Sequence, residues 1–393
     1  MTKYFFYSIL FTLLFSGYTC TPAFAQHAGA TDGYQLVWQD LFDQGSLNTK
    51  VWNPQNSTKS PELEQYLPAN VSVGIEPHSG QSAMILTAKK ENYGGMTCTS
   101  GKVNTQKNMY FQYGKLEARI RIPKTANGLW PAFWFMGEDF ASGVAWPACG
   151  EIDLMEMGSA SAYSAGTQEK FVNETLHWGN GSDKGSGKSY TWNYSLQDTL
   201  HLYTLIWDAN SIKMYIDLDK TPDPPSNTYT SWTTTYNSSN ANIGYYFNKP
   251  FYIIINLAIG GGFPNVNNIN NVTAFNTDPE PKMYVESVKL YQLDPSDPSY
   301  SSGQFYYGPK LVTGMLTPES EPLKIGQDDS GNILVNVDAE ALRSIALYNI
   351  SGQKMLEVSG TNIVYTSSLP AGYYIVKIQT NAGKSESFKF MKK

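Results

Sequence analysis

Short runs of β-branched and aromatic residues alternate with polar residues from Tyr34 to about Gln292, and Gly, Pro, Asn and Ser separate the runs. A period of two is typical of strands that bury one face, and no long amphipathic helical pattern interrupts the runs. The pattern predicts an all-β domain, built as one antiparallel β-sandwich of about 260 residues. The clearest runs are GKLEARIRIP at 114–123, HLYTLIWD at 201–208, SIKMYID at 211–217, FYIIINLAI at 251–259 and MYVESVKLYQL at 283–293.

The composition changes between residues 293 and 322, where Pro, Ser and Gly predominate, so this stretch is predicted to be a linker. Residues 323–393 return to period-two alternation with turns at Ser-Gly and Ala-Gly. They predict a second, small β-sandwich of about 70 residues. All nine Trp residues precede it.

The N-terminus has the three parts of a secretory signal. Lys3 is followed by an apolar run from Phe5 to Phe15, and Ala23 and Ala25 form an A-x-A cleavage site. The apolar run is too short for a membrane span. We therefore expect residues 1–25 to be a signal peptide, residues 26–292 to be the main domain, and the protein to be secreted.

Composition narrows the classes of partner. Only 16% of residues are charged, the net charge is -6 and the pI is about 5.3, so nucleic acid is an improbable partner. The four His residues are scattered and predict no metal cluster. Without the signal only Cys98 and Cys149 are left, and one bridge or two buried thiols are both open.

The segment WPACGEIDLMEMGS, at 146–159, places three carboxylates in a strand. Residues i and i+2 share a face, so Glu151 and Asp153 lie together, whereas Glu156 points to the other face unless an extra residue restores the phase. A β-bulge near Leu154 and Met155 would bring Glu156 back. The alternative is a solvated strand face without a catalytic role.

The distance between the two glutamates constrains the chemistry. Four strand steps separate their backbones by roughly 13 Å. A retaining glycosidase needs its carboxyl groups about 5 to 5.5 Å apart, so the side chains must lean together on a bent sheet, and a flatter sheet would suit an inverting enzyme.

Aromatic residues close to these acids favour a sugar substrate. Trp130 and Trp134 in NGLWPAFWFMG, together with Trp146, lie close to the acids in the sequence, all within the 21 residues before Glu151. Aromatic faces match the C–H faces of sugar rings, while carboxylates and amides bind the hydroxyl groups. Core packing is the alternative role for Trp130 or Trp134.

Several motifs, in their order along about 260 residues, carry a family resemblance. The chain resembles bacterial laminarinase-type enzymes of glycoside hydrolase family 16, in the branch with a bulged E-x-D-x-x-E motif. The resemblance implies a concanavalin-like β-jelly-roll sandwich with a concave catalytic cleft. The motifs are TSGKVNT at 99–105, YGKLEARIRIP at 113–123, GLWPAFW at 128–134, WPACGEIDLME at 146–156, TLHWG at 175–179, INLAIGG at 255–261 and MYVESVKLYQ at 283–292.

The resemblance assigns roles to the three acids. It implies that Glu151 is the nucleophile, that Glu156 is the general acid and base, and that Asp153 tunes both. General physical chemistry agrees with this division, because a nucleophile must be ionised, an acid must hold a proton, and a neighbouring carboxylate raises the pKa of its partner.

The resemblance also implies substrate contacts and an ion. Trp146 matches the Trp beside the cleaved sugar, His177 matches a cleft histidine, and Glu64 resembles a position in a substrate loop. Lys102 stands where many relatives have Arg, so a bidentate contact is lost. No cofactor is needed for the chemistry, and many relatives bind a structural calcium ion with an Asp where this chain has Glu286.

The tail resembles the C-terminal sorting domain of the type IX secretion system of Bacteroidetes, with a carbohydrate-binding module as the alternative. We therefore expect a monomer, secreted or held at the cell surface, whose partners are β-glucan and the secretion machinery. The expected activity is endo-hydrolysis of β-1,3-glucan and of mixed β-1,3-1,4-glucan, with retention. An agarase or carrageenase, and a non-catalytic β-glucan-binding lectin, are the alternatives.

Overall fold

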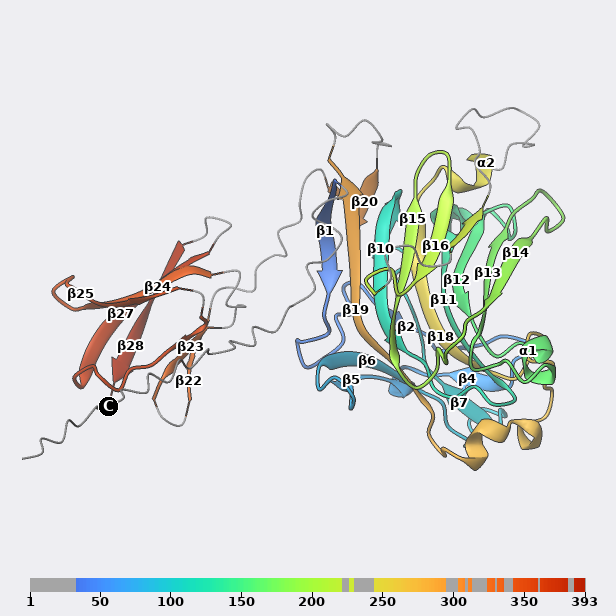
Figure 1. Cartoon of the computed structure of the whole chain (residues 1–393), viewed down its shortest axis with the longest axis horizontal. Helices are drawn as coiled ribbons and strands as arrows, with labels where there is room; N and C mark the ends of the chain where they lie inside the picture. The colour runs from blue at the N-terminus through green and yellow to red at the C-terminus, as the bar shows by residue number, and fades with distance from the viewer. Residues whose placement is uncertain are drawn as a thin grey trace, which may run out of the picture. The chain divides into compact units, whose positions relative to one another are not determined.

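The computed structural model divides the chain into two compact units, Met1–Met315 and Leu316–Lys393, which we describe separately (Figure 1). The expected signal peptide at 1–25 and most of the expected linker lie outside the described residues. The structure describes residues 33–220, 226–229, 244–294, 303–307, 310–312, 324–328, 331–335, 342–359, 361–380 and 385–392.

Two large sheets form the layers of unit 1 (Figure 1). In spatial order the first sheet contains β17 (Ser226–Tyr229), β16 (Ile212–Ile216), β15 (Leu200–Trp207), β10 (Gly114–Arg121), β19 (Lys282–Leu293), β6 (Ser82–Thr87) and β5 (Val71–Ile75), with β1 (Tyr34–Asp40) paired to β19. The second contains β14 (Ser186–Thr191), β13 (Phe171–His177), β12 (Glu151–Glu156), β11 (Leu129–Gly137), β18 (Phe251–Ile259), β9 (Met109–Gln112), β20 (Gln304–Tyr307) and β21 (Lys310–Val312), and also β8 (Lys102–Asn104) and β2 (Asn53–Pro54).

Smaller elements complete unit 1. Strands β3 (Ser57–Thr58), β4 (Glu64–Tyr66) and β7 (Cys98–Ser100) form a separate sheet in which β4 and β7 run parallel. The helices are short: α1 (Ala160–Ser164), α2 (Gly244–Phe247), and the 3₁₀ turns η2 (Pro68–Asn70), η3 (Glu138–Ser142), η4 (Ile269–Asn271) and η5 (Thr273–Asn276). No helix among the described residues is long and apolar enough to cross a membrane. The expected all-β jelly-roll class is confirmed.

Aromatic side chains join the two large sheets in the core. Trp207, on β15 of the first sheet, is almost fully buried. Its ring lies 5.7 Å from that of Phe111 on β9 and 5.5 Å from that of Phe251 on β18, both nearly edge-on. Edge-to-face contacts of this kind add to the free energy gained by burying the rings, so the layers are fixed against each other.

The ordered part of unit 1 extends into the range expected to be a linker. Strand β20 pairs with β9, and Phe305 lies opposite Phe111. The Phe305 side chain is 1% exposed, and its ring lies 6.5 Å from that of Trp38 on β1. The apolar QFYY segment is short, and the Pro, Ser and Gly around it hid its strand character.

Unit 2 is a small β-sandwich with its own core. A sheet of β22 (Ile325–Gln327), β23 (Ile333–Val335) and β26 (Ile363–Val364) accompanies a sheet of β25 (Lys354–Val358), β24 (Leu342–Asn349), β27 (Gly372–Thr380) and β28 (Ser385–Lys392). The core includes Ile345, Leu347, Val376 and Ile378, all fully buried. A separate core of this kind is what an independently folding domain needs.

The two cysteines among the described residues of unit 1 are unpaired. Cys98 lies on β7 and Cys149 lies two residues before β12, and both thiols are buried and free. Of the two arrangements that the sequence left open, the structure contains two buried thiols.

Candidate active site

The predicted bulge in β12 is confirmed by its pairing with both neighbouring strands. Against β11, Met155 pairs with Phe133 and Asp153 pairs with Trp134, so Leu154 is an extra residue on β12. Against β13, the register shifts by one residue between Asp153 and Glu156. Leu154 and Met155 are consecutive and both fully buried, and two residues of β12 against one residue of β11 is the pairing of a β-bulge.

The bulge brings the three acids to one face of the ten-stranded sheet. Glu151 lies opposite His177 on β13, Asp153 opposite Thr175 and Glu156 opposite Asn173. These three β13 residues alternate along the strand, and residues directly opposite each other share a face. The site is therefore on the side of the sheet that faces away from the buried Leu154 and Met155.

The same face continues across the sheet as a row of paired positions. Lys102 on β8 lies opposite Asn256 on β18, Asn256 opposite Ala132 on β11, and Ala132 opposite Glu156, which is followed by Asn173. Ala132 has a small side chain, which separates the amide group of Asn256 from the carboxyl group of Glu156. A row that contains the ammonium group of Lys102, this amide and this carboxyl group is suited to binding hydroxyl groups.

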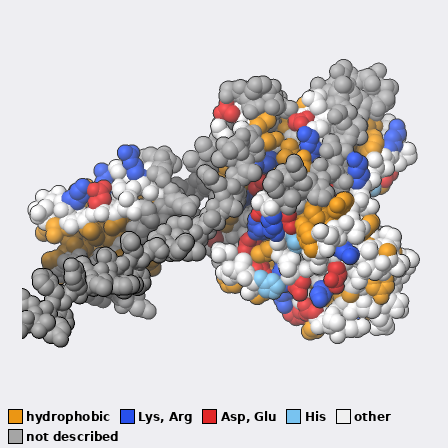
Figure 2. Space-filling view, in the orientation of Figure 1, with side chains coloured by type: hydrophobic (Ala, Val, Ile, Leu, Met, Phe, Trp, Pro, Cys, Tyr) orange, Lys and Arg blue, Asp and Glu red, His pale blue; other side chains and the backbone are white. Residues whose placement is uncertain are grey.

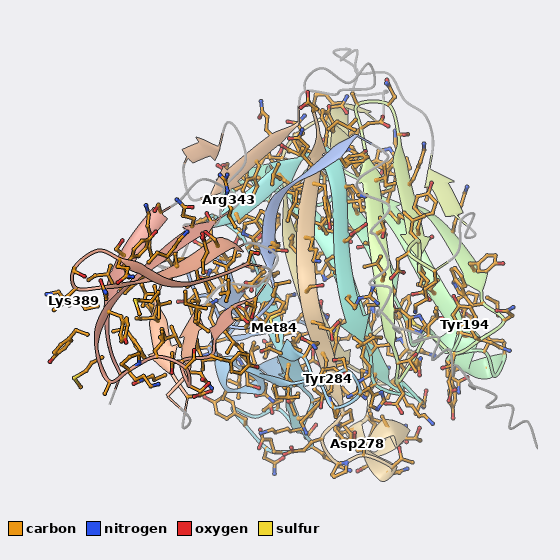
Figure 3. All side chains as sticks on the ribbon, turned by 60° about the vertical axis from the view of Figure 1, so that its left-hand side comes forward. Met84, Tyr194, Asp278, Tyr284, Arg343 and Lys389 are labelled. Carbon is orange, nitrogen blue, oxygen red and sulfur yellow. The ribbon has the colours of Figure 1, made fainter. Side chains whose placement is uncertain are left out.

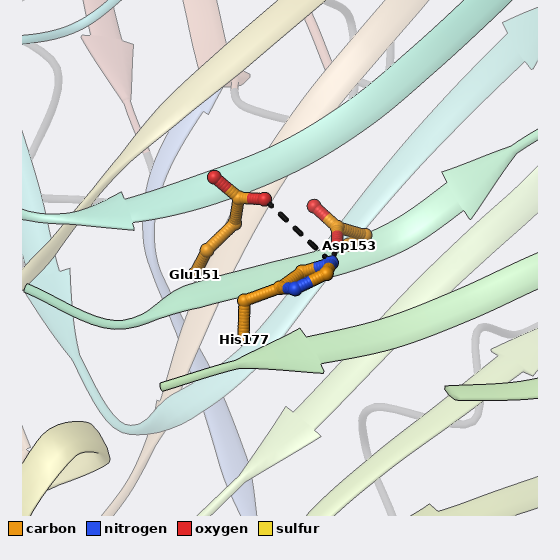
Figure 4. A group of neighbouring side chains, drawn as sticks. All are labelled: Glu151, Asp153 and His177. Carbon is orange, nitrogen blue, oxygen red and sulfur yellow. Dashed lines mark ion pairs between the residues drawn. The ribbon is translucent and has the colours of Figure 1, made fainter. Parts of the chain in front are cut away.

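His177 joins the acids into a cluster (Figure 4). Its Nε2 lies 3.4 Å from Oδ2 of Asp153 and 4.0 Å from Oε1 of Glu151, while its Nδ1 lies 2.8 Å from Oδ2 of Asp183. The donor atoms of Glu151, Asp153 and His177 lie within 4.8 Å of one another. Carboxyl groups bind a metal ion only when they are deprotonated. Burial favours the protonated form of the carboxyl groups in this cluster, so we assign the cluster to holding and exchanging protons between the acids and His177.

Burial is the main influence on the acids. It raises the pKa of Glu156 well above the ordinary range, although a hydrogen bond from Nε1–H of Trp130 to Oε1, 3.0 Å long, lowers it. Burial, followed by repulsion from Glu151 and Glu156, raises the pKa of Asp153, and no opposing influence acts on it. Burial and the neighbouring carboxyl groups therefore favour the protonated form of Asp153.

Glu151 is the acid with a nearby cation. Burial and then repulsion from Glu156 and Asp183 raise the pKa of Glu151, but Lys102 and the indole of Trp146 lower it. Both of these groups favour the charged form of the carboxyl group, but burial and the neighbouring acids outweigh them and raise the pKa of Glu151 to about 8, against about 7 for Glu156. Lys102 and Trp146 are therefore the groups that move Glu151 toward the ionised form that a nucleophile requires.

The three predicted tryptophans all belong to the site. Trp146 is 45% exposed, and its ring lies 5.7 Å from that of His177. Trp130 is half-buried and stacks on Phe263 at 4.9 Å, while its indole donates to Glu156. Trp134 is also half-buried and donates from Nε1–H to Oδ1 of Asn256 at 2.7 Å. Core packing, the alternative considered for Trp130 or Trp134, holds in part for Trp134, which packs against a buried cluster that includes Met136 and Tyr252.

Of the two remaining substrate candidates, only one reaches the face. Nζ of Lys102 lies 5.3 Å from the ring centroids of both Tyr66 and Trp134. Glu64 is fully buried, and its Oε2 accepts a hydrogen bond from the backbone N–H of Ile259. Because the strand β4 turns Glu64 inward, its position differs from the expected one in a substrate loop.

Sequence reasoning missed several polar residues at the site. Nδ2 of Asn256 donates to Oη of Tyr66, and that hydroxyl group donates to Oε2 of Glu62 at 3.0 Å. Asp183 is the other omission. Asn256 lies in a motif, INLAIGG, and its single polar side chain among apolar neighbours was a usable signal.

The residues around Glu286 do not fit a calcium site. Glu286 lies on β19, two residues beyond Tyr284, which Figure 3 labels. Nε of Arg119 lies 3.9 Å from its Oε2, and the same guanidinium group pairs with Asp219 at 2.5 Å. Calcium needs six to eight oxygen ligands, and here Arg119 already supplies the positive charge. No step below uses a metal ion.

Comparisons with known proteins agree with this geometry. Residues 68–246 match the family described as Glycosyl hydrolases family 16, and residues 329–393 match the Secretion system C-terminal sorting domain. A solved family 16 protein of the Bacteroides ovatus mixed linkage glucan locus, in complex with a G4G4G3G product, is 35% identical, with a TM-score of 0.55. The match covers 65% of this chain and 100% of that one.

Two curated relatives are also similar. Glucan endo-1,3-beta-glucosidase of Cryptopygus antarcticus is 31% identical over 60% of this chain and 84% of its own. Glucan endo-1,3-beta-glucosidase A1 of Niallia circulans is 28% identical over 67% of this chain. The chain spans only 38% of the length of that second relative.

Proposed function

The chain belongs to family 16 of the glycosyl hydrolases, and we propose that it is an endo-β-1,3-glucanase that also accepts mixed β-1,3-1,4-glucan and retains the anomeric configuration. The observation that carries the proposal is the bulge at Leu154, because it places Glu151, Asp153 and Glu156 on one face. The glucan specificity rests on what the relatives act on.

In the proposed first step, Glu151 attacks the anomeric carbon while Glu156 gives its proton to the glycosidic oxygen. The C–O bond to the leaving chain breaks, and an ester forms between the sugar and Glu151. Glu156, now ionised, takes a proton from a water molecule, which attacks the same carbon and releases Glu151. Two inversions restore the β configuration.

The surroundings of each acid support these roles. Trp130 holds Glu156 in a fixed orientation, and burial keeps a proton on it for the leaving group. Lys102 and Trp146 favour the charge on Glu151. The exposed ring of Trp146 is placed to stack on the sugar beside Glu151.

The stereochemistry of the first product tests the proposal. Proton NMR in the first minutes of laminarin digestion is expected to show the β-anomer before mutarotation, because a covalent intermediate is formed and then hydrolysed. Transglycosylation products are expected at high oligosaccharide concentration. An α-anomer appearing first would require a direct attack by water and would exclude both the ester and the role of Glu151.

A reducing-sugar assay on laminarin, lichenan, agarose and carrageenan tests the substrate class, with release expected from the first two. On the face seen in Figure 2, Lys and Arg side chains of unit 1 are interspersed with Asp and Glu, which does not favour a sulfated polymer. Release from carrageenan or agarose alone would indicate a galactan hydrolase. Binding of laminarin without any release would indicate a lectin.

We propose that the sorting domain directs the protein to the cell surface or the medium as a monomer, after the signal peptide has directed it across the inner membrane. A chain that ends after Met315 is expected to keep activity on soluble glucan within about twofold, because unit 1 is compact by itself, and to lose export in the native host. Export is followed by blotting cell and medium fractions.

A chain that ends after Leu293 is the matched comparison. It also lacks β20 and the buried Phe305, whose loss alone would cost about 3 to 5 kcal/mol of stability. We expect it to be less thermostable than the longer chain. Normal export of the chain that ends after Met315, with loss of binding to insoluble glucan, would instead identify unit 2 as a binding module.

A further inference from the structure

The loop between β13 and β14 places one more acid against the catalytic cluster. Oδ2 of Asp183 lies 2.8 Å from Nδ1 of His177, on the side of the ring opposite to Asp153. Oδ1 of Asp183 accepts the backbone N–H of Gly185 at 2.8 Å. The carboxylate is thus held by its own loop while it contacts the histidine.

We propose that Asp183 is a positioning residue that fixes the tautomer and orientation of His177, so that Nδ1 carries a proton and Nε2 accepts a hydrogen bond from the protonated carboxyl group of Asp153. This assignment rests on the proposed function, in which Asp153 lies beside the nucleophile. An ionised carboxylate has only acceptor oxygens, so the nitrogen facing Asp183 must be the one that bears hydrogen.

The packing around the ring supports a fixed orientation. A Cβ atom on Gly185 would lie 2.9 Å from Nδ1 of His177 and 3.2 Å from Cε1, so the loop closes on the ring where only glycine fits. The ring of Trp146 lies near the imidazole as well, at 5.7 Å. His177 is therefore confined by the loop and by Trp146.

The tautomer of His177 determines whether Asp153, the neighbour of Glu151, is neutral or charged. Oδ2 of Asp153 is buried and makes no hydrogen bond, and Nε2 of His177 lies 3.4 Å from it, so a lone pair on Nε2 would give the proton of Asp153 an acceptor and favour its place on the carboxyl group. Glu151 then has a neutral neighbour when it ionises. If Nε2 carried the proton instead, it would favour the charged form of Asp153, and two carboxylates would repel each other next to the reacting carbon.

Among the described residues, only a few charged groups act on the pair formed by Glu151 and Asp153. Glu151 and Glu156 on β12 and Asp183 on the loop raise the pKa of Asp153 in addition to its burial, and Lys102 on β8 lowers that of Glu151. Asp183 therefore has two opposing effects. Its charge repels the cluster from a distance, while its contact with His177 gives the Asp153 proton a partner.

The substitution Asp183→Asn tests the proposal. The Asn Oδ1 can still accept the Gly185 N–H, but its NH₂ group would face Nδ1 and favour the opposite tautomer, with hydrogen on Nε2. An inverted tautomer disables a histidine without changing the geometry. We expect kcat on laminarin to fall 10- to 100-fold, the range for groups that orient a site residue, with KM changed less than about threefold.

The pH dependence of kcat/KM distinguishes a positioning role of Asp183 from a merely structural one, because a structural role would leave it unchanged. The acidic limb of kcat/KM reports deprotonation of Glu151 in the free enzyme. Loss of the Asp183 charge by itself would lower the pKa of Glu151 and move the acidic limb to lower pH, because that charge raises this pKa in the wild type. If the changed tautomer leaves Asp153 ionised beside Glu151, the pKa of Glu151 rises instead, so we expect the acidic limb to move to higher pH in Asp183→Asn. The matched control is Asp208→Asn, since Asp208 also accepts backbone N–H groups in a surface turn, from Asn210 and Ser211, away from the site. We expect it to leave the profile unchanged.

Imidazole ¹⁵N NMR of the wild-type protein decides the tautomer directly and requires neither a variant nor activity. Hydrogen on Nδ1 of His177 and none on Nε2 is expected, and hydrogen on Nε2, alone or together with Nδ1, would overturn the proposal. An acidic limb that is unmoved or moves to lower pH in a folded Asp183→Asn protein would also overturn it. Absence of glucan hydrolysis by the wild type would refute the proposed function, while the NMR result would still test the role of Asp183.

Discussion

Replacing Glu151 with alanine is expected to lower kcat on laminarin by a factor of about 10⁴ or more, and azide is expected to restore turnover of an aryl β-glucoside substrate with a good leaving group. The truncated side chain leaves room beside the anomeric carbon on the face opposite to the leaving group. Azide attacks from there in a single displacement. The product should be an α-glycosyl azide, identified by NMR.

The Glu156→Ala variant distinguishes the two roles. It keeps the nucleophile, so azide intercepts the ester and gives the β-glycosyl azide. An α product from Glu156→Ala, with a β product from Glu151→Ala, would reverse the assignment. Glu169→Ala, which changes an exposed acid outside the site, controls for loss of a carboxyl group and should keep full activity.

Deletion of Met155 is expected to reduce activity by a factor of about 10³ or more. The deletion gives a regular strand in which Glu151 and Glu156 still share a face and keep Met136 and Ala132, four residues apart on β11, as their partners. It removes the buried Met155 side chain from the core and the local bend and twist of the bulge, which direct Glu156 to its hydrogen bond with Trp130. Steady-state kinetics and circular dichroism measure activity and folding.

A conservative change at the same position separates packing from register. Met155→Leu keeps the bulge and nearly the same volume, so it should cost less than about 1.5 kcal/mol in unfolding free energy and leave kcat within a few-fold. A deletion variant with nearly normal kcat would show that the bulge is dispensable for the geometry of the acids.

The sequence predicted those parts of the site that depend on local periodicity. Glu151 and Asp153 share a face because of strand alternation, and the mismatch at Glu156 required a bulge, which the pairing of Leu154 confirms. The family motif added the roles. The shared face of the acids and the bulge both follow from the order of residues within one strand, without contacts between distant strands.

The features that sequence missed depend on the path of the chain in space. Asp183 reaches His177 only because the loop turns back at Gly185, and the five intervening residues carry no period that would show it. Glu64 was expected in a substrate loop, but it lies on β4, which pairs in parallel with β7, and its side chain is fully buried. Strand β20 is too short to stand out from its Pro- and Ser-rich surroundings.

The two buried thiols make the fold independent of redox conditions. Burial is the main influence that raises the pKa of Cys98 and of Cys149, each to about 12. The thiolate is the form that reacts with oxidants and alkylating agents, and its fraction at neutral pH is then negligible. Unit 1 should therefore fold equally well in a reducing cytosol and in an oxidising medium, without a disulfide isomerase and without loss of activity in dithiothreitol.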